Sequence, residues 1–169
     1  MPSEPLSKAL AKKFPMPPGD MEQTCAPLIA VGPDAVRELV GLVGDEFGDP
    51  NGVNPKYLLH GLALYASRAG AETERKMVAE ALAATLSAQH SDELKAFVTR
   101  QLQLCGRPDD VPALGALLDS DRLCEPAAQA LQAIGGREAR NALKKALAKA
   151  DGGRKATLRQ AVKFLSEQE

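Results

Sequence analysis

The segment 123–150 contains two runs of apolar residues at helical spacing, separated by Gly135 and Gly136. In the second run, Leu143 and Ala146 belong to a series that recurs every three or four residues, while polar and cationic residues occupy the opposite side. Glycine can adopt the positive φ that ends a helix. The pattern therefore predicts two amphipathic helices joined by a glycine turn, which together form a helical hairpin.

This hairpin pattern recurs along the chain. Gly32, Gly70, Gly106 and Gly136 follow one another at intervals of 30 to 38 residues, which is typical of helical repeat proteins. Short helices with alanine-rich faces cannot form a core alone, so we expect successive hairpins to stack on one another. The equivalent triplets after the four glycines, apolar except for Thr85, are Leu39, Leu42 and Val43; Leu82, Thr85 and Leu86; Leu114, Leu117 and Leu118; and Leu143, Ala146 and Leu147.

The glycine-turn segments that begin at Val31, Cys105 and Leu123 resemble the HEAT-repeat superfamily, in particular its short-repeat branch named after the phycobiliprotein lyases. The resemblance covers roughly residues 20–168. It implies an all-α fold, namely a right-handed α-solenoid of stacked antiparallel helical hairpins, with about four repeats plus a capping helix. It also implies a scaffold or adaptor, because the superfamily is used mainly for binding.

We divide the chain into an N-terminal arm with a proline-rich spacer, residues 1–19, and a HEAT-like repeat domain, residues 20–169. The arm contains a weak helix candidate over 3–13, and the prolines of 14–19 stop it. Two interpretations of the arm stay open: it packs on the first repeat or on a partner, or it is a partly ordered tail.

Several helix starts can be placed from capping residues. Asn54 followed by Pro55 predicts an N-cap and a first helical position, and Ser91 predicts the N-cap of another helix. Asp109 and Asp110 are interpreted as N-capping residues before the helix at Val111. The last helix is expected over about 154–168, where it would cap the end of the stack.

Composition limits the class of protein. The chain has 169 residues, of which 44% are apolar, 25% charged and 4% aromatic, and this balance argues against disorder. No apolar run approaches the ~20 residues that span a bilayer. The first ten residues, MPSEPLSKAL, lack the apolar core of a signal peptide, so a cytoplasmic location is the default expectation; an export signal removed beforehand stays open.

Groups that could support chemistry are few. Cys25, Cys105 and Cys124 are odd in number and widely spaced, which favours structural thiols over a disulfide framework or zinc site. Asp45, Asp49 and Asn51 in the acidic segment 44–54 suggest a calcium loop, but Lys56 occupies the position of its bidentate glutamate and its central glycine is missing, so we expect no metal there. No serine, cysteine or histidine grouping indicates a nucleophile. We therefore expect a protein that is not an enzyme and that uses no cofactor.

Charge is distributed unevenly. Residues 137–169 hold nine Lys or Arg against four Asp or Glu, a balance of +5, while the rest holds twelve against eighteen, a balance of −6. If the second helices of the hairpins line a concave side, as the resemblance implies, the candidate partner-binding residues of this region lie on or beside a groove. They are Arg137, Asn141, Lys144 and Lys145. An ordinary solvated helix surface is the alternative interpretation.

His60 and Arg68 complete the candidates, because they share a predicted helix with Tyr57 and Tyr65. A packing or surface histidine is the alternative for His60. The favoured function is a non-catalytic protein–protein interaction scaffold with a partner of unknown identity. A nucleic-acid binder that uses the C-terminal basic face is the second hypothesis. A chromophore-lyase-like binder is the third, and it rests on the resemblance alone.

Overall fold

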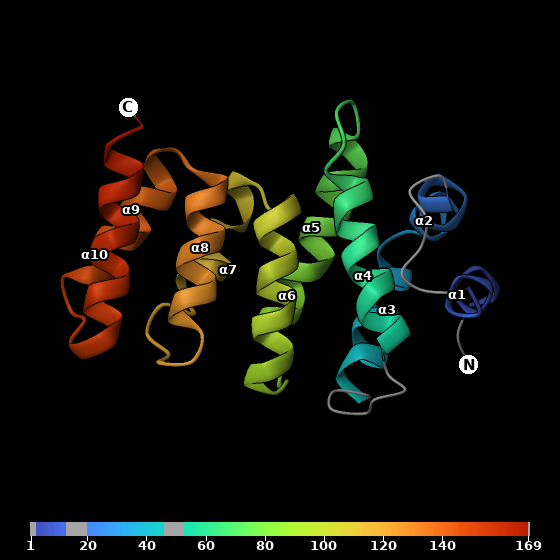
Figure 1. Cartoon of the computed structure of the whole chain (residues 1–169), viewed down its shortest axis with the longest axis horizontal. Coiled ribbons are helices and arrows are strands. Elements are labelled where there is room, and N and C mark those ends of the chain that lie inside the picture. The colour runs from blue at the N-terminus through green and yellow to red at the C-terminus, as the bar shows by residue number, and fades with distance from the viewer. Residues whose placement is uncertain (1–2, 13–19, 46–52, 169) are drawn as a thin grey trace.

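The computed structural model describes residues 3–12, 20–45 and 53–168, and within these ranges the chain is helical and contains no strand (Figure 1). The prediction of an all-α fold is confirmed for these residues. In chain order the helices are α1 (Glu4–Leu10), α2 (Met21–Val31), α3 (Pro33–Asp45), α4 (Val53–Ala66), α5 (Glu72–Leu86), α6 (Asp92–Cys105), the 3₁₀ helix η2 (Pro108–Asp110), α7 (Val111–Gly115), α8 (Cys124–Ile134), α9 (Gly136–Leu147) and α10 (Gly152–Ser166).

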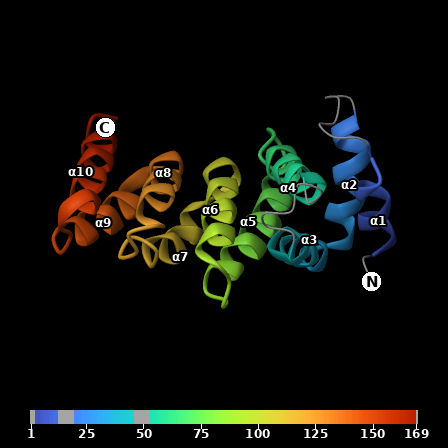
Figure 2. The same ribbon diagram turned by 60° about the horizontal axis from the view of Figure 1, so that its bottom comes forward.

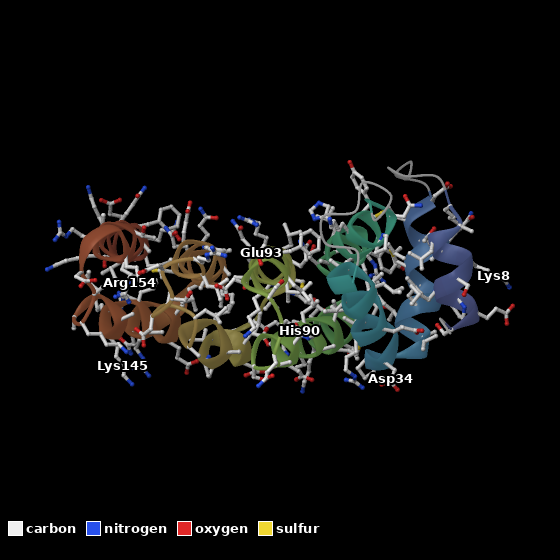
Figure 3. The ribbon with its side chains drawn as sticks, turned by 90° about the horizontal axis from the view of Figure 1, so that it is seen from below. Lys8, Asp34, His90, Glu93, Lys145 and Arg154 are labelled. Carbon is white, nitrogen blue, oxygen red and sulfur yellow. The ribbon has the colours of Figure 1, made fainter. Side chains whose placement is uncertain are left out.

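From α3 onward the helices lie in two rows (Figures 2 and 3). In the even row, α4 contacts α6, α6 contacts α8, and α8 contacts α10; in the odd row, α3 contacts α5, α5 contacts α7, and α7 contacts α9. The chain passes back and forth between the rows, and its two ends lie at opposite ends of the array (Figure 1). Each helix therefore packs mainly against helices that are close to it in sequence.

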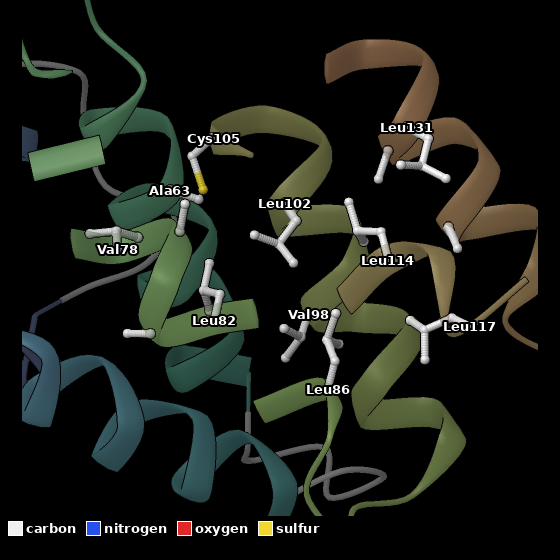
Figure 4. Close-up of a cluster of buried hydrophobic side chains, with 14 of the residues drawn as sticks. Ala63, Val78, Leu82, Leu86, Val98, Leu102, Cys105, Leu114, Leu117 and Leu131 are labelled. Atoms are coloured by element: carbon white, nitrogen blue, oxygen red, sulfur yellow. The ribbon is translucent and has the colours of Figure 1, made fainter. Parts of the chain in front are cut away.

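The core lies between the rows and consists of leucines and small residues (Figure 4). Leu39, Leu82, Leu114 and Leu143, which begin the four predicted triplets, are all fully buried. Small side chains are completely buried beside them, which allows neighbouring helix axes to approach closely. These fully buried alanines are Ala63, Ala66, Ala79, Ala127, Ala130 and Ala139.

The glycine turns serve two different purposes. Gly135 and Gly136 have φ values of +72° and +78°, which confirms the positive φ predicted for this pair, and Gly32 and Gly70 have φ values of +92° and +80°. Gly106 has a φ of −58° and needs no such freedom. A Cβ at Gly106 would instead lie 2.4 Å from the carbonyl oxygen of Leu102, so here glycine is required by space.

The end of α6 at this point is held by an arginine from the neighbouring helix. Arg75 in α5 donates from Nε to the carbonyl oxygen of Cys105 at 2.9 Å, and from Nη2 to that of Gly106 at 2.7 Å. Neither carbonyl has a partner inside α6, because Cys105 is the last residue of this helix and Gly106 is its C-cap. The contact of Arg75 therefore fixes the relative position of α5 and α6.

Two predicted capping interactions differ from the structure. Helix α4 begins at Val53, so Asn54 is not its N-cap; the side-chain amide of Asn54 donates to the carbonyl oxygen of Leu10 at 3.3 Å and ties α4 to α1. Helix α7 begins at Val111 as predicted, and Asp110 occupies its N-cap position. The carboxylate of Asp110, however, accepts from the backbone N–H of Arg107 at 2.8 Å, so it caps η2 and makes no capping bond to α7. Burial raises the pKa of Asp110.

Other boundaries agree with the sequence. The hydroxyl of Ser91 accepts from the N–H of Leu94 at 3.2 Å, which confirms Ser91 as an N-cap. Helix α10 packs against α8 and α9, with Leu158 and Leu165 buried. Helix α1 contacts α2 and α4, and its Leu6 is fully buried. The proline-rich spacer and most of the acidic segment 44–54 lie outside the described residues.

The space around Gly106 gives a test with an internal control. We expect Gly106→Ala to destabilise the protein by roughly 1–3 kcal/mol, because the new methyl group would overlap the backbone of Leu102 and the side chain of Ile134. Gly115→Ala would meet only Ala142 at an ordinary 3.7 Å in a helix, so it should be neutral or stabilising by up to about 1 kcal/mol. Urea unfolding of both variants measures this, and equal effects would contradict the account.

Candidate binding surfaces

The four α9 candidates lie together on one side of their helix. Arg137, Asn141, Lys144 and Lys145 are all exposed, and they are opposite the buried stripe that includes Leu143. Figure 3 shows Lys145 on the side of the odd row that points away from the even row. The sequence interpretation of a polar, largely cationic stripe therefore corresponds to a real outer surface of α9.

Part of the charge near this stripe is neutralised within the protein. Lys149 Nζ lies 2.6 Å from Asp119 Oδ2, and this hydrogen bond holds the pKa of Asp119 below its usual value. Arg154 joins α10 to the preceding turns: it donates to the carbonyl oxygen of Asp119 at 3.1 Å and to Asp151 Oδ1 at 3.2 Å, and its Nε lies 2.9 Å from Asp121 Oδ1. These contacts are structural and leave other cations available.

Among the described residues, five cations of the α9–α10 end form no ion pair within 4 Å. They are Arg137, Lys144, Lys145, Lys155 and Arg159. A group of unpaired cations attracts anions over several ångströms, and that attraction weakens with salt.

His60 and Arg68 do not join this stripe. Both lie in or beside α4 in the even row, and each has a partner of its own. His60 is exposed, with Nδ1 at 3.0 Å from Gln101 Oε1 of α6. Arg68 lies 2.7 Å from Glu74 Oε2 and 3.7 Å above the ring of Tyr65, so its guanidinium is engaged at the α4–α5 turn. The six candidates therefore divide between two surfaces: four lie on α9, and His60 and Arg68 lie at α4.

A surface that the sequence did not indicate lies on the outer side of the even row. Tyr57, Leu64 and Phe164 are 45%, 42% and 44% exposed, and they are three of the four large hydrophobic residues with exposed side chains in the described ranges. Tyr57, His60 and Leu64 follow helical spacing along α4, so they share one side of it. The even-row surface consists of Tyr57, His60, Leu64 and Phe164, together with a groove across α6, α8 and α10.

The groove crosses α6, α8 and α10. It is lined by four glutamines, one small residue and one aromatic residue: Gln103, Gln129, Gln132, Ala133, Phe164 and Gln168. No charged residue lines it. Of the four side-chain amides, only that of Gln129 makes a hydrogen bond to a described residue, a long one of 3.4 Å to Glu125. We call this the amide groove.

Other chemistry is sparse in the part of the chain that the structure describes. No cluster of three or more His, Cys, Asp or Glu could hold a metal ion there. The three cysteines are free thiols and are all buried. Burial raises the pKa of Cys25 from 9.0 to about 11 and that of Cys105 from 9.0 to about 12, so neither is an activated nucleophile.

Comparison with known proteins assigns the chain to no family. No protein-family model matches the chain, and no curated protein matches it. Among the described helices, none is long and apolar enough to cross a bilayer.

The buried thiols lead to a prediction of reactivity. Near pH 8 the native protein should react with a chromogenic disulfide reagent at least about a hundredfold more slowly than the urea-unfolded chain, because the thiols are buried and protonated. Fast labelling of all three thiols in native protein would contradict their burial.

The folded thiols keep their protons to higher pH than unfolded ones, so native stability should fall as pH rises from about 9 towards 11–12.

Proposed function

We propose that the protein is a non-catalytic scaffold that binds another protein through the even-row surface. The observation that carries this proposal is the position of Tyr57, Leu64 and Phe164, exposed on α4 and α10 of one row. Aromatic and aliphatic residues are enriched at the centres of protein interfaces, and charged residues are depleted there. The amide groove between these residues is also uncharged. The combination is typical of a protein-binding surface.

The proposed architecture is a HEAT-like α-solenoid with a right-handed superhelix. It is supported by contacts that run from each helix to its neighbours along the rows, and by the glycine turns that join the members of each hairpin. Such arrays present long, continuous surfaces, and they are mainly used to hold partners. Single exposed apolar residues are common on any protein, so the weight of the proposal lies on their position along one row of helices, with Tyr57 and Leu64 on α4 and Phe164 on α10.

A second function, binding to a nucleic-acid backbone, is favoured by one observation. Arg137, Lys144 and Lys145 are exposed on one side of α9 and have no ion-pair partner among the described residues. Cations in this arrangement can replace the counterions of phosphates. An aromatic platform for unpaired bases is missing from the stripe, so this alternative applies to a duplex backbone.

The scaffold proposal can be tested by capture of partners from cell lysate with and without cross-linking. We expect Leu64→Glu to reduce the captured partners at least about tenfold, since it places a charge at the apolar part of the surface. Val31→Glu is the matched control, because Val31 is 40% exposed at the end of α2, outside this surface. Equal capture by wild type and Leu64→Glu, with unchanged circular dichroism, would contradict the proposal.

The nucleic-acid alternative has its own test. If it holds, a gel shift with duplex DNA at ~50 mM salt should weaken steeply as salt is raised, and Lys144→Glu with Lys145→Glu should abolish it. The control is Lys155→Glu with Arg159→Glu in α10, which makes the same change of charge outside α9 and shows whether the loss of binding is specific to α9. Absence of any shift at ~50 mM salt removes the alternative.

A further inference from the structure

Helices α1 and α2 lie side by side at the N-terminal end of the array (Figure 1), and a cavity of about 400 Å³ lies between them. This volume is in the range of sites that bind small molecules. The residues that line the cavity recur at helical spacing on both sides, so one face of each helix borders it. From α2 they are Gln23, Thr24 and Pro27; from α1 and the turn after it they are Glu4, Pro5, Lys8, Ala9 and Lys12.

Thr24 is a buried polar residue of this cavity that has no hydrogen-bond partner. Only 3% of its surface is exposed, and its hydroxyl group makes no hydrogen bond to the described part of the chain. Thr85 in α5 shows the usual arrangement, since its buried hydroxyl donates to the carbonyl oxygen of Leu82 at 2.7 Å. Thr99 in α6 also lacks a partner but is completely enclosed, whereas Thr24 borders a cavity. An unpaired buried hydroxyl destabilises a fold, so the cavity is where a ligand would satisfy Thr24.

A second unused group lies one residue away from Thr24. Pro27 stands inside α2 and has no N–H, so the carbonyl oxygen of Gln23, four residues earlier, lacks the donor that a helix normally supplies. Gln23 and Pro27 are both exposed and both line the cavity. One side of α2 therefore offers the cavity a carbonyl acceptor and a hydroxyl group, which together suit a ligand with an N–H or O–H donor.

The charge of the cavity comes from α1 and the turn after it. Lys8 Nζ lies 2.6 Å from Glu4 Oε1, so these two charges neutralise each other. Lys12 is half-buried and forms no ion pair within 4 Å with a described residue. Burial raises the pKa of the Cys25 thiol, and the charges of Arg68 and Lys12 oppose that rise, so the ammonium group of Lys12 acts towards α2. The cavity thus has one uncompensated positive charge.

These features limit the class of ligand. A phosphate monoester carries about two negative charges at neutral pH, which is more than Lys12 alone compensates, and Glu4 would repel the excess. A metal ion does not fit, because no cluster of three or more His, Cys, Asp or Glu could hold one in the described ranges. A single carboxylate matches the single free charge. The remaining walls, Pro5, Ala9 and Pro27, are apolar and favour an apolar body.

We propose that this cavity binds a small apolar carboxylic acid that carries an N–H or O–H donor next to its carboxylate. The carboxylate pairs with Lys12, and the donor bonds to the carbonyl oxygen of Gln23 or the hydroxyl oxygen of Thr24. The apolar body packs against the two prolines and the alanine of the walls. The site shares no residue with the even-row surface, so it goes beyond the proposed function and does not depend on it.

The test uses two probes that have these features, N-acetyl-leucine and 2-hydroxy-4-methylpentanoic acid. NMR spectra of the full chain, labelled at its threonine methyl groups, measure binding. We expect the signal of Thr24 to shift in a saturable manner while that of Thr99 stays unchanged. N-acetyl-leucinamide lacks the carboxylate and should bind at least about tenfold more weakly. 4-Methylpentanoic acid lacks the donor and should bind at least about threefold more weakly.

Variants then identify the groups that bind. Lys12→Gln should weaken binding of the better probe at least about tenfold. Lys163→Gln is the matched control, because Lys163 is exposed on α10 at the other end of the array, and it should change affinity less than about twofold. Thr24→Val keeps the shape of the side chain and should weaken binding at least about threefold without lowering stability to urea, since the hydroxyl has no partner in the free protein.

Three results overturn the proposal. They are the absence of a saturable shift with either probe up to about 10 mM, equal binding of N-acetyl-leucinamide, and an affinity unchanged by Lys12→Gln. If Thr24→Val fails to fold, Lys12→Gln still decides, because Lys12 lies beyond the end of α1 and contributes no buried side chain to the core.

Discussion

Close contact between successive helices through small side chains is the constraint on which the rest of the structure depends. Ala63, Ala79 and Ala130 are completely buried, and Gly106 has no room for a single additional carbon atom. Leucines fill the remaining space between the rows. Because each contact joins helices that are near in sequence, the core extends along the array and does not converge on one centre.

This mode of packing determines which residues stay exposed and can contact a partner. Every helix between the ends buries one stripe against its neighbours and leaves another on the outer side of its row, so adjacent helices combine their outer residues into one surface. In the even row this surface carries Tyr57, Leu64 and the amide groove, while in the odd row α9 carries Lys144 and Lys145. Two chemically distinct surfaces thus follow from one packing rule.

Most features that depend on a single helix could be predicted from the sequence. Periodicity identified Leu143 and Ala146 as core residues, glycine chemistry identified the turns at Gly32 and Gly135, and capping chemistry identified Ser91. Each of these depends on residues within a few positions of one another. The same local reasoning placed the cationic residues of α9 on one exposed side.

Features that depend on contacts between helices could not be predicted. The sequence predicts Asn54 as the N-cap of its own helix, whereas its side-chain amide donates to the carbonyl oxygen of Leu10 at the end of α1. The amide groove could not be predicted, because Gln103, Gln132 and Gln168 are about thirty residues apart in sequence and line one groove only when α6, α8 and α10 pack together. Exposed Tyr57 and Phe164 could have served as a signal, since both fall outside the apolar stripes of their helices.

Small-angle X-ray scattering tests the central claim most directly, because a core that extends along an array gives an elongated molecule (Figure 1). A compact domain of 169 residues has a radius of gyration of about 15–16 Å. We expect a clearly larger value and an asymmetric pair-distance distribution with a long tail. A value near 15–16 Å with a symmetric distribution, measured on a monomer, would contradict the account.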